Sequence, residues 1–187
     1  MVSIGASTIL ALLLLSPLSE EVVGMSQGTA ELWTRQEVGN TGITAQLPQA
    51  AASPFKSEKV DQAAQSLQQF DAHTVRIGEV SIVFQRATMA PNRPTSARAI
   101  TEATIQRLQE GDAFADLRLE SVPVTISGKN GFKIQGSGLR TDSEAGITML
   151  ILVDGNRLWQ VSSVYDARIP EQVATVKRVI DSVQIRG

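Results

Sequence analysis

The sequence predicts an α+β fold in which a central β-sheet is covered by helices on both faces. Residues 147–153, with the sequence ITMLILV, are apolar at nearly every position. A strand with one exposed face would alternate, so this strand is expected to be covered on both sides. Two amphipathic helical segments, residues 96–110 and the segment that begins at Pro170, can provide the covering layers.

The first half of the chain is predicted to contain short strands, a loop and a short helix. Residues 32–38 and 43–47 have the pattern of two short strands, joined by the turn-rich tetrapeptide GNTG. Residues 48–54 are rich in Ala, Ser and Pro, which favours a loop. In residues 57–70 apolar side chains recur at helical spacing, which predicts a short helix. Residues 73–89 alternate on both sides of a Gly-Glu pair, which is typical of a hairpin or a long bent strand.

Both predicted helices carry recognisable end signals. Thr95 or Ser96 can cap the N-terminus of the helix over residues 96–110. Gly111 is expected to end that helix in a left-handed conformation, which a residue with a Cβ resists. Pro170 suits the first position of the last helix. The apolar stripe of that helix consists of Val173, Val176, Ile180 and Val183.

The second half of the chain is predicted to be mostly sheet. The expected strands are residues 117–119, 122–127, 132–139, 147–153 and 157–165. Residues 128–131, GKNG, join two of them. A Gly-x-x-Gly loop with a Lys can hold phosphate or nucleic-acid backbone, but those loops join a strand to a helix or two helices. We therefore interpret GKNG as a tight hairpin turn with Asn130 and Gly131 at its centre.

The N-terminal segment predicts export. Residues 4–15 are 12 uncharged residues, which is too short for a membrane-spanning helix of about 20 residues and typical of the apolar part of a secretory signal. Cleavage is expected after Gly24, or alternatively after Ser19, although residues 1–3 lack the usual basic charge. We expect residues 1–24 to be a signal peptide and residues 25–187 one domain; the alternative is a buried N-terminal helix.

Composition excludes several classes of function. The chain has 17 basic and 19 acidic residues, so no net positive field attracts nucleic acid. It contains no Cys, which excludes disulfides, thiolate catalysis and a lipid anchor on an N-terminal Cys. We expect a periplasmic or extracellular protein that is not an integral membrane protein once the signal is cleaved.

No residue pattern predicts catalysis or metal binding. The single His, His73, has no Cys to activate and no second His with which to hold a metal. No Ser lies in the Gly-x-Ser-x-Gly sequence of a nucleophile elbow. The nearest groups of carboxylates, Asp112 with Asp116 and Asp142 with Glu144, lie in predicted turns and are interpreted as solvated acids. We expect no catalytic residue, no metal and no cofactor.

Four residues are candidates for ligand binding. Arg93 and Arg98 flank the start of the middle helix, where an anion is favoured, but ordinary surface ion pairs are the preferred interpretation, because the Arg residues are dispersed through the chain and balanced by acids. Trp159 and Tyr165 belong to one predicted strand. Trp159 shares a face with Val161, so we expect it to pack in the core; the alternative is a pocket between the sheet and a helix, near Trp159 and Tyr165.

An ordered series of motifs resembles a known superfamily. The series consists of Trp33, Leu47-Pro48, Gly128 to Gly131, Asp154-Gly155, Leu158-Trp159-Gln160-Val161 and Asp181-Ser182. It resembles the PsbP-like superfamily, in particular the DcrB-like envelope proteins of bacteria, over roughly residues 33–185. The resemblance implies an antiparallel sheet sandwiched between helices. It implies no shared catalytic residues, since the superfamily includes non-catalytic photosystem subunits, a Ran-binding transport factor and many exported proteins.

These observations predict an exported, non-catalytic accessory protein that binds a protein partner in the cell envelope. The alternative is a carrier or sensor of a small ligand, with a pocket between sheet and helix near Trp159 and Tyr165.

Overall fold

The computed structural model describes residues 32–49, 67–90, 96–141 and 143–186. The expected signal peptide, most of the predicted helix at residues 57–70, Arg93 and Asp142 lie outside these described residues.

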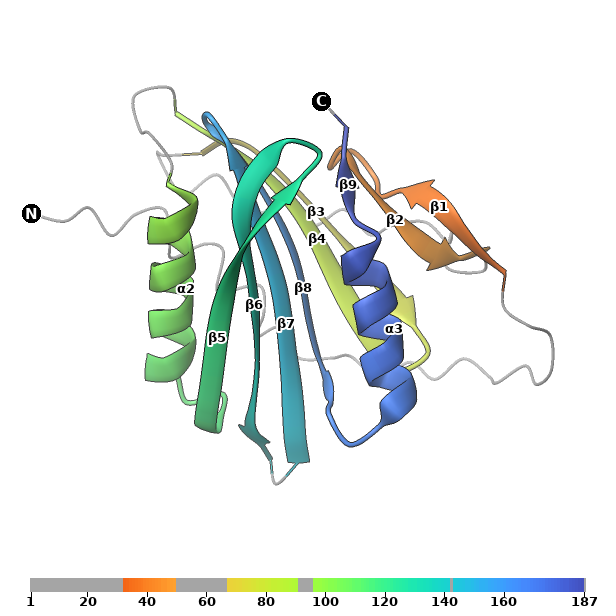
Figure 1. The fold of residues 1–187 in the computed structure, drawn as a ribbon, viewed down its shortest axis with the longest axis vertical. Coiled ribbons are helices and arrows are strands. Elements are labelled where there is room, and N and C mark those ends of the chain that lie inside the picture. Colours follow the sequence, from red (N-terminus) through yellow and green to blue (C-terminus); the bar gives the residue numbers. More distant parts are fainter. Residues whose placement is uncertain (1–31, 50–66, 91–95, 142, 187) are drawn as a thin grey trace, which may run out of the picture.

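A six-stranded antiparallel sheet forms the centre of the fold (Figure 1). The order of its strands is β3-β4-β8-β7-β6-β5. Its strands are β3 (Leu67–Ile77), β4 (Val80–Met89), β5 (Ala115–Ile126), β6 (Lys129–Arg140), β7 (Ser143–Asp154) and β8 (Arg157–Asp166). The alternation of apolar and polar residues and the short turns between them predicted these strands. One difference is that the two short strands expected at residues 117–119 and 122–127 form one continuous strand, β5.

A smaller sheet packs beside the large one. It has the order β1-β2-β9, with β1 (Trp33–Glu37), β2 (Ile43–Pro48) and β9 (Gln184–Ile185). The first two strands were predicted, but β9 was not. Ile185 pairs with Ile43, so the end of the chain becomes a strand only through a partner more than 100 residues away in the sequence.

The two helices cover opposite faces of the six-stranded sheet. Helix α2 (Ala97–Glu110) contributes Leu108 to one apolar core, which also contains Ile147, Met149 and Ile151 of β7. Helix α3 (Pro170–Asp181) and the small sheet cover the other face, where Leu150 and Leu152 of β7 are buried. Successive residues of β7 therefore enter different cores, which confirms the predicted fold class and the expectation that this strand is covered on both sides.

The β5–β6 hairpin turns at a different place from the predicted one. The pair Ile126 and Lys129 closes a two-residue turn formed by Ser127 and Gly128, which have φ angles of 51° and 73°. Two positive φ angles make this a type I′ turn. Gly131 lies within β6, where a Cβ atom would overlap the backbone of Ile151 on β7. The prediction of a hairpin is confirmed, but the central dipeptide is Ser-Gly rather than Asn-Gly.

Three further expectations are wrong. Residues 67–70 begin β3 rather than ending a helix, because Phe70 pairs with Ala87 of β4. Gly111 is extended, with φ −82° and ψ 153°, and its N–H donates to the carbonyl of Arg107. Val183 lies beyond the end of α3, although it is buried in the same core as the stripe of the helix.

Within the described part of the chain, no helix has the length and apolar character needed to cross a membrane.

Candidate functional site

Trp159 is a core residue, as its shared strand face with Val161 predicts. Its side chain is 2% exposed and belongs to the core beneath α3 and the small sheet. The indole Nε1–H donates to the carbonyl of Thr41, at 3.1 Å, in the turn between β1 and β2. Arg86 donates to the carbonyl of Asn40 in the same turn, at 3.3 Å. The six-stranded sheet thus holds the small sheet through main-chain acceptors of one turn.

Tyr165 lies on the same face of β8 but far from Trp159. Its ring covers Gly146, where a side chain would overlap it, and its hydroxyl lies 3.3 Å from the hydroxyl of Thr148. Six residues of strand separate the two aromatics, which corresponds to about 20 Å. The structure therefore does not bring Trp159 and Tyr165 into one pocket.

Arg98 is exposed at the start of α2. Its guanidinium lies 3.9 Å from Glu102 and 5.7 Å from the ring centre of Phe132. The N-cap is already occupied, since Ser96 accepts a hydrogen bond from the backbone N–H of Ala99. An i,i+4 surface ion pair contributes little to stability. These contacts agree with the interpretation of Arg98 as a member of a surface ion pair.

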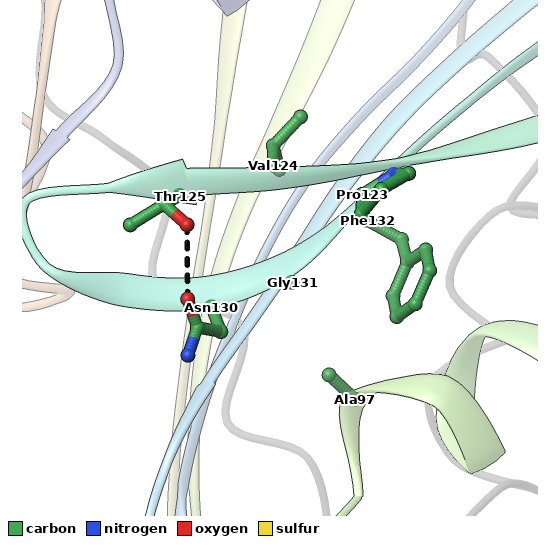
Figure 2. A pocket seen from close by; sticks show the side chains of 7 residues that line it. All are labelled: Ala97, Pro123, Val124, Thr125, Asn130, Gly131 and Phe132. Carbon is green, nitrogen blue, oxygen red and sulfur yellow. Dashed lines mark hydrogen bonds between the residues drawn. The ribbon is translucent and has the colours of Figure 1, made fainter.

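A small pocket lies between the start of α2 and the end of the β5–β6 hairpin (Figure 2). Its volume is about 280 Å³. It is lined by Ala97, Pro123, Val124, Thr125, Asn130, Gly131 and Phe132. Thr125 donates to the amide oxygen of Asn130 at 2.9 Å across its floor. No charged side chain lines the pocket, and its volume is at the lower limit of typical small-molecule sites.

The single His is part of the core. His73 is 6% exposed, and its ring lies so close to Gly39 that a Cβ atom there would overlap it. Burial lowers the pKa of His73 below 6.5, although the charge of Asp71 acts in the opposite direction. A buried His with a lowered pKa is neutral near pH 7.

We predict that His73 titrates below pH 6.5 in the folded protein. Its folded pKa lies below its unfolded pKa, so the unfolded chain binds more protons and stability falls as the pH drops through about 6.5. As the chain has one His, its ring resonances in an NMR titration report this group alone. A midpoint at or above 6.5 would contradict the buried placement.

Asp154 and Asp181 are held in ion pairs with lysines that lower their pKa values. Asp154 accepts a hydrogen bond from Lys129 at 2.6 Å, which lowers its pKa. Desolvation would raise the pKa of Asp181, but hydrogen bonds from Lys177 and Lys133 outweigh it and the pKa is lowered. The Lys of the GKNG sequence is thus an ion-pair partner.

Asp166 gives the second pH prediction. Hydrogen bonds from the side chain and backbone of Arg168 lower its pKa to about 2. Its contribution to stability is therefore present above about pH 4 and is lost as the pH falls toward about 2. Urea unfolding between pH 2 and 5 is expected to show a shallower acid decline for Asp166→Asn. An identical decline in both proteins would refute this pairing in solution.

The acidic side chains that the structure describes lie apart from one another. Among the residues that the structure describes, no group of three His, Asp or Glu side chains lies close enough to hold an ion. Asp112 lies in the turn after α2, Asp116 adopts φ 50° within β5, and Glu144 is exposed on β7.

The sequence did not predict that one group of polar residues is buried. Gln85 of β4 and Gln160 and Ser162 of β8 are almost fully buried, and they carry polar atoms without a hydrogen-bond partner. The only signal in the sequence is that each lies in a strand between apolar residues. The neighbouring positions of the two Gln residues follow from strand pairing and not from any motif.

Sequence comparison adds no family. No protein-family model matches the chain, and no curated protein matches it.

Comparison of structures reveals similar folds. The cyanobacterial PsbP protein CyanoP from Synechocystis has a TM-score of 0.52 and 12% identity, over 88% of this chain and 98% of that one. LpqN of Mycobacterium tuberculosis, described as involved in cell envelope biogenesis, has a TM-score of 0.50 and 10% identity, over 85% and 93%. PA94 of Pseudomonas aeruginosa, of unknown function, has a TM-score of 0.49 and 9% identity, over 83% and 98%. At these identities the likeness concerns the fold alone, and the match to CyanoP shows that this chain has a PsbP-like fold.

Proposed function

We propose that this chain is an exported, non-catalytic accessory protein of the cell envelope that acts by binding a protein partner, and that it is most similar to the DcrB-like proteins. The state of four ionisable side chains supports the non-catalytic part of the proposal. His73 and the carboxyls of Asp154, Asp166 and Asp181 all have lowered pKa values because of burial or ion pairs. A general acid or base needs a pKa near the working pH, and these shifts move the groups away from it.

Two observations support the location. Residues 4–15 have the length and composition of the apolar part of a secretory signal. LpqN, which shares the fold, is described as involved in cell envelope biogenesis. A fold is a weak guide to function, so the proposal depends on a direct test.

Site-specific photo-crosslinking in the native envelope tests partner binding. The reactive residue is placed at Val122 of β5, at Leu139 of β6, or at Glu102 on the exposed side of α2. A specific partner contacts one part of the surface, so we expect one predominant protein adduct from some of these positions and none from the others. Equal labelling from all three, or no adduct, would count against a protein partner.

The His73→Gln variant tests the non-catalytic part of the proposal. Adduct formation and cellular function are expected to persist, provided that the urea midpoint of the variant shows that it is folded. Loss of a measured enzymatic activity in a folded His73→Gln protein would contradict the proposal.

A further inference from the structure

Strand β5 forms a long edge of the six-stranded sheet (Figure 1). It has 12 residues, and among the described strands it pairs with β6 on one side only. Most of its side chains are exposed. The outer side of an edge strand presents backbone N–H and C=O groups to which a further strand can bind. We therefore asked which of these groups are available and what they fit.

The turn of the β5–β6 hairpin determines which backbone groups of β5 face outward. In a two-residue hairpin the residues that flank the turn, here Ile126 and Lys129, exchange both backbone hydrogen bonds. Since such pairs alternate with non-hydrogen-bonded ones, the even-numbered residues from Arg118 onward bind β6 and the odd-numbered ones face outward. The carbonyl oxygen of Arg118 lies against Gly136 of β6, in agreement with this pattern. Pro123, which has no N–H, occupies an outward-facing position, as expected on an edge strand.

Two irregularities limit the part of this edge that can pair. The register with β6 shifts at the start of β5, where Asp116 adopts φ 50°. Further along the strand, Pro123 removes one outward-facing donor. Bulges and prolines protect edge strands from pairing with other chains. Between these two positions Leu119 and Ser121 keep both of their outward-facing backbone groups in a regular strand, so a further strand would pair there.

The side chains of this segment are complementary to a second copy of the same segment. Arg118 and Glu120 are exposed on one face of β5, and within the described part of the chain neither belongs to an ion pair. If two copies of β5 lie antiparallel with Leu119 opposite Leu119, each Arg118 lies directly opposite Glu120 of the other copy. Opposite charges at directly paired positions stabilise a pair of strands.

Other antiparallel registers of this segment are less favourable. With Ser121 opposite itself, Leu119 would face Pro123, which lacks a donor. With Glu120 opposite itself, or with Arg118 opposite itself, like charges would face each other. The backbone pattern and the charges therefore favour the same register, centred on Leu119.

We propose that two copies of this chain associate edge to edge through β5, antiparallel and centred on Leu119. The two copies are related by a twofold axis, and their six-stranded sheets become one continuous sheet. The face that carries Arg118 and Glu120 is open to the second copy, since the main contacts of α3 are with β2, β4, β7 and β8. The paired segment is short, so the interface is small and the Kd is expected in the micromolar range. This inference goes beyond the proposed function and does not depend on it.

Sedimentation equilibrium of the purified full chain, over concentrations that span the micromolar range, tests the pairing. We expect a monomer–dimer equilibrium that weakens as salt is added, because exposed ion pairs are screened. Ser121→Pro removes an outward-facing N–H in both copies and is expected to raise the Kd about tenfold or more. Thr125→Pro is the matched control, because it makes the same backbone change at an outward-facing position of β5 beyond the proposed contact. It is expected to leave the Kd unchanged.

Charge reversal gives a second test, which remains valid if Ser121→Pro does not fold. Arg118→Glu and Glu120→Arg each place like charges opposite each other at both symmetry-related pairs, and each is expected to raise the Kd about tenfold. The double variant restores opposite charges and is expected to recover the Kd of the natural chain. The proposal is overturned if the natural chain is monomeric throughout, if a folded Ser121→Pro protein associates as strongly as the natural chain, or if the double variant associates no more strongly than the single ones.

Discussion

Trp159→Ala is expected to lower the free energy of unfolding by about 3–5 kcal/mol, as removal of a buried aromatic side chain does. The indole is 2% exposed and packs in the core that joins the six-stranded sheet, α3 and the small sheet. The substitution removes this contact and the hydrogen bond to Thr41 together. Urea unfolding followed by circular dichroism measures the change.

Two milder variants separate the contributions of Trp159. Trp159→Phe keeps most of the apolar contact but leaves the carbonyl of Thr41 without its donor, which is expected to cost about 1–3 kcal/mol. Tyr165→Phe removes only a half-exposed hydroxyl at 3.3 Å from Thr148 and is expected to cost about 0.5 kcal/mol. If Trp159→Ala were as stable as the natural protein, the side chain would not be a core residue, and the interpretation as a pocket wall would return.

Gly39→Ala is expected to cost about 2–5 kcal/mol. Gly39 has φ 51°, a conformation that costs a residue with a Cβ about 1–2 kcal/mol. The new methyl group would also overlap the buried ring of His73, and overpacking adds about 1–3 kcal/mol. The turn that carries Thr41 would move, so the hydrogen bond from Trp159 is expected to weaken as well.

Gly128→Ala is the control for Gly39→Ala. Gly128 also has a positive φ, at 73°, but the space around it is open, so only the backbone cost of about 1–2 kcal/mol is expected. Combining Gly39→Ala with His73→Ala removes the overlapping ring, and the two changes are expected to be less destabilising together than the sum of the single changes. Strict additivity would show that the ring and the turn are not in contact.

Strands and helices were predictable because their signals are local. The alternation of Val80, Ile82 and Phe84, the N-cap at Ser96 and the Pro170 that begins α3 depend on residues a few positions apart. The predictions were wrong where contacts between segments far apart in the sequence determine the local conformation. Asn-Gly is the commoner centre of a tight turn, yet Gly131 is needed in β6 because the backbone of Ile151 approaches it closely.

The candidate site was much less predictable than the fold. The position of Trp159 beside Val161 on one strand face predicts core packing, but its hydrogen bond to the carbonyl of a residue 118 positions earlier in the chain could not be predicted. Gln85 and Gln160 look unremarkable in the sequence, since Gln is common on exposed strand positions. Their burial and their pairing are properties of the assembled sheet.

The sequence by itself determined most of the strands, the helices α2 and α3, and that residues 147–153 would be covered on both faces, because hydrophobic periodicity and capping act over a few residues. Only the tertiary structure decided that β9 joins β2, that the turn at Gly39 contacts Trp159 and His73, and that Gln85 and Gln160 are buried next to each other. These features depend on register and on contacts between segments far apart in the chain, which local patterns do not specify.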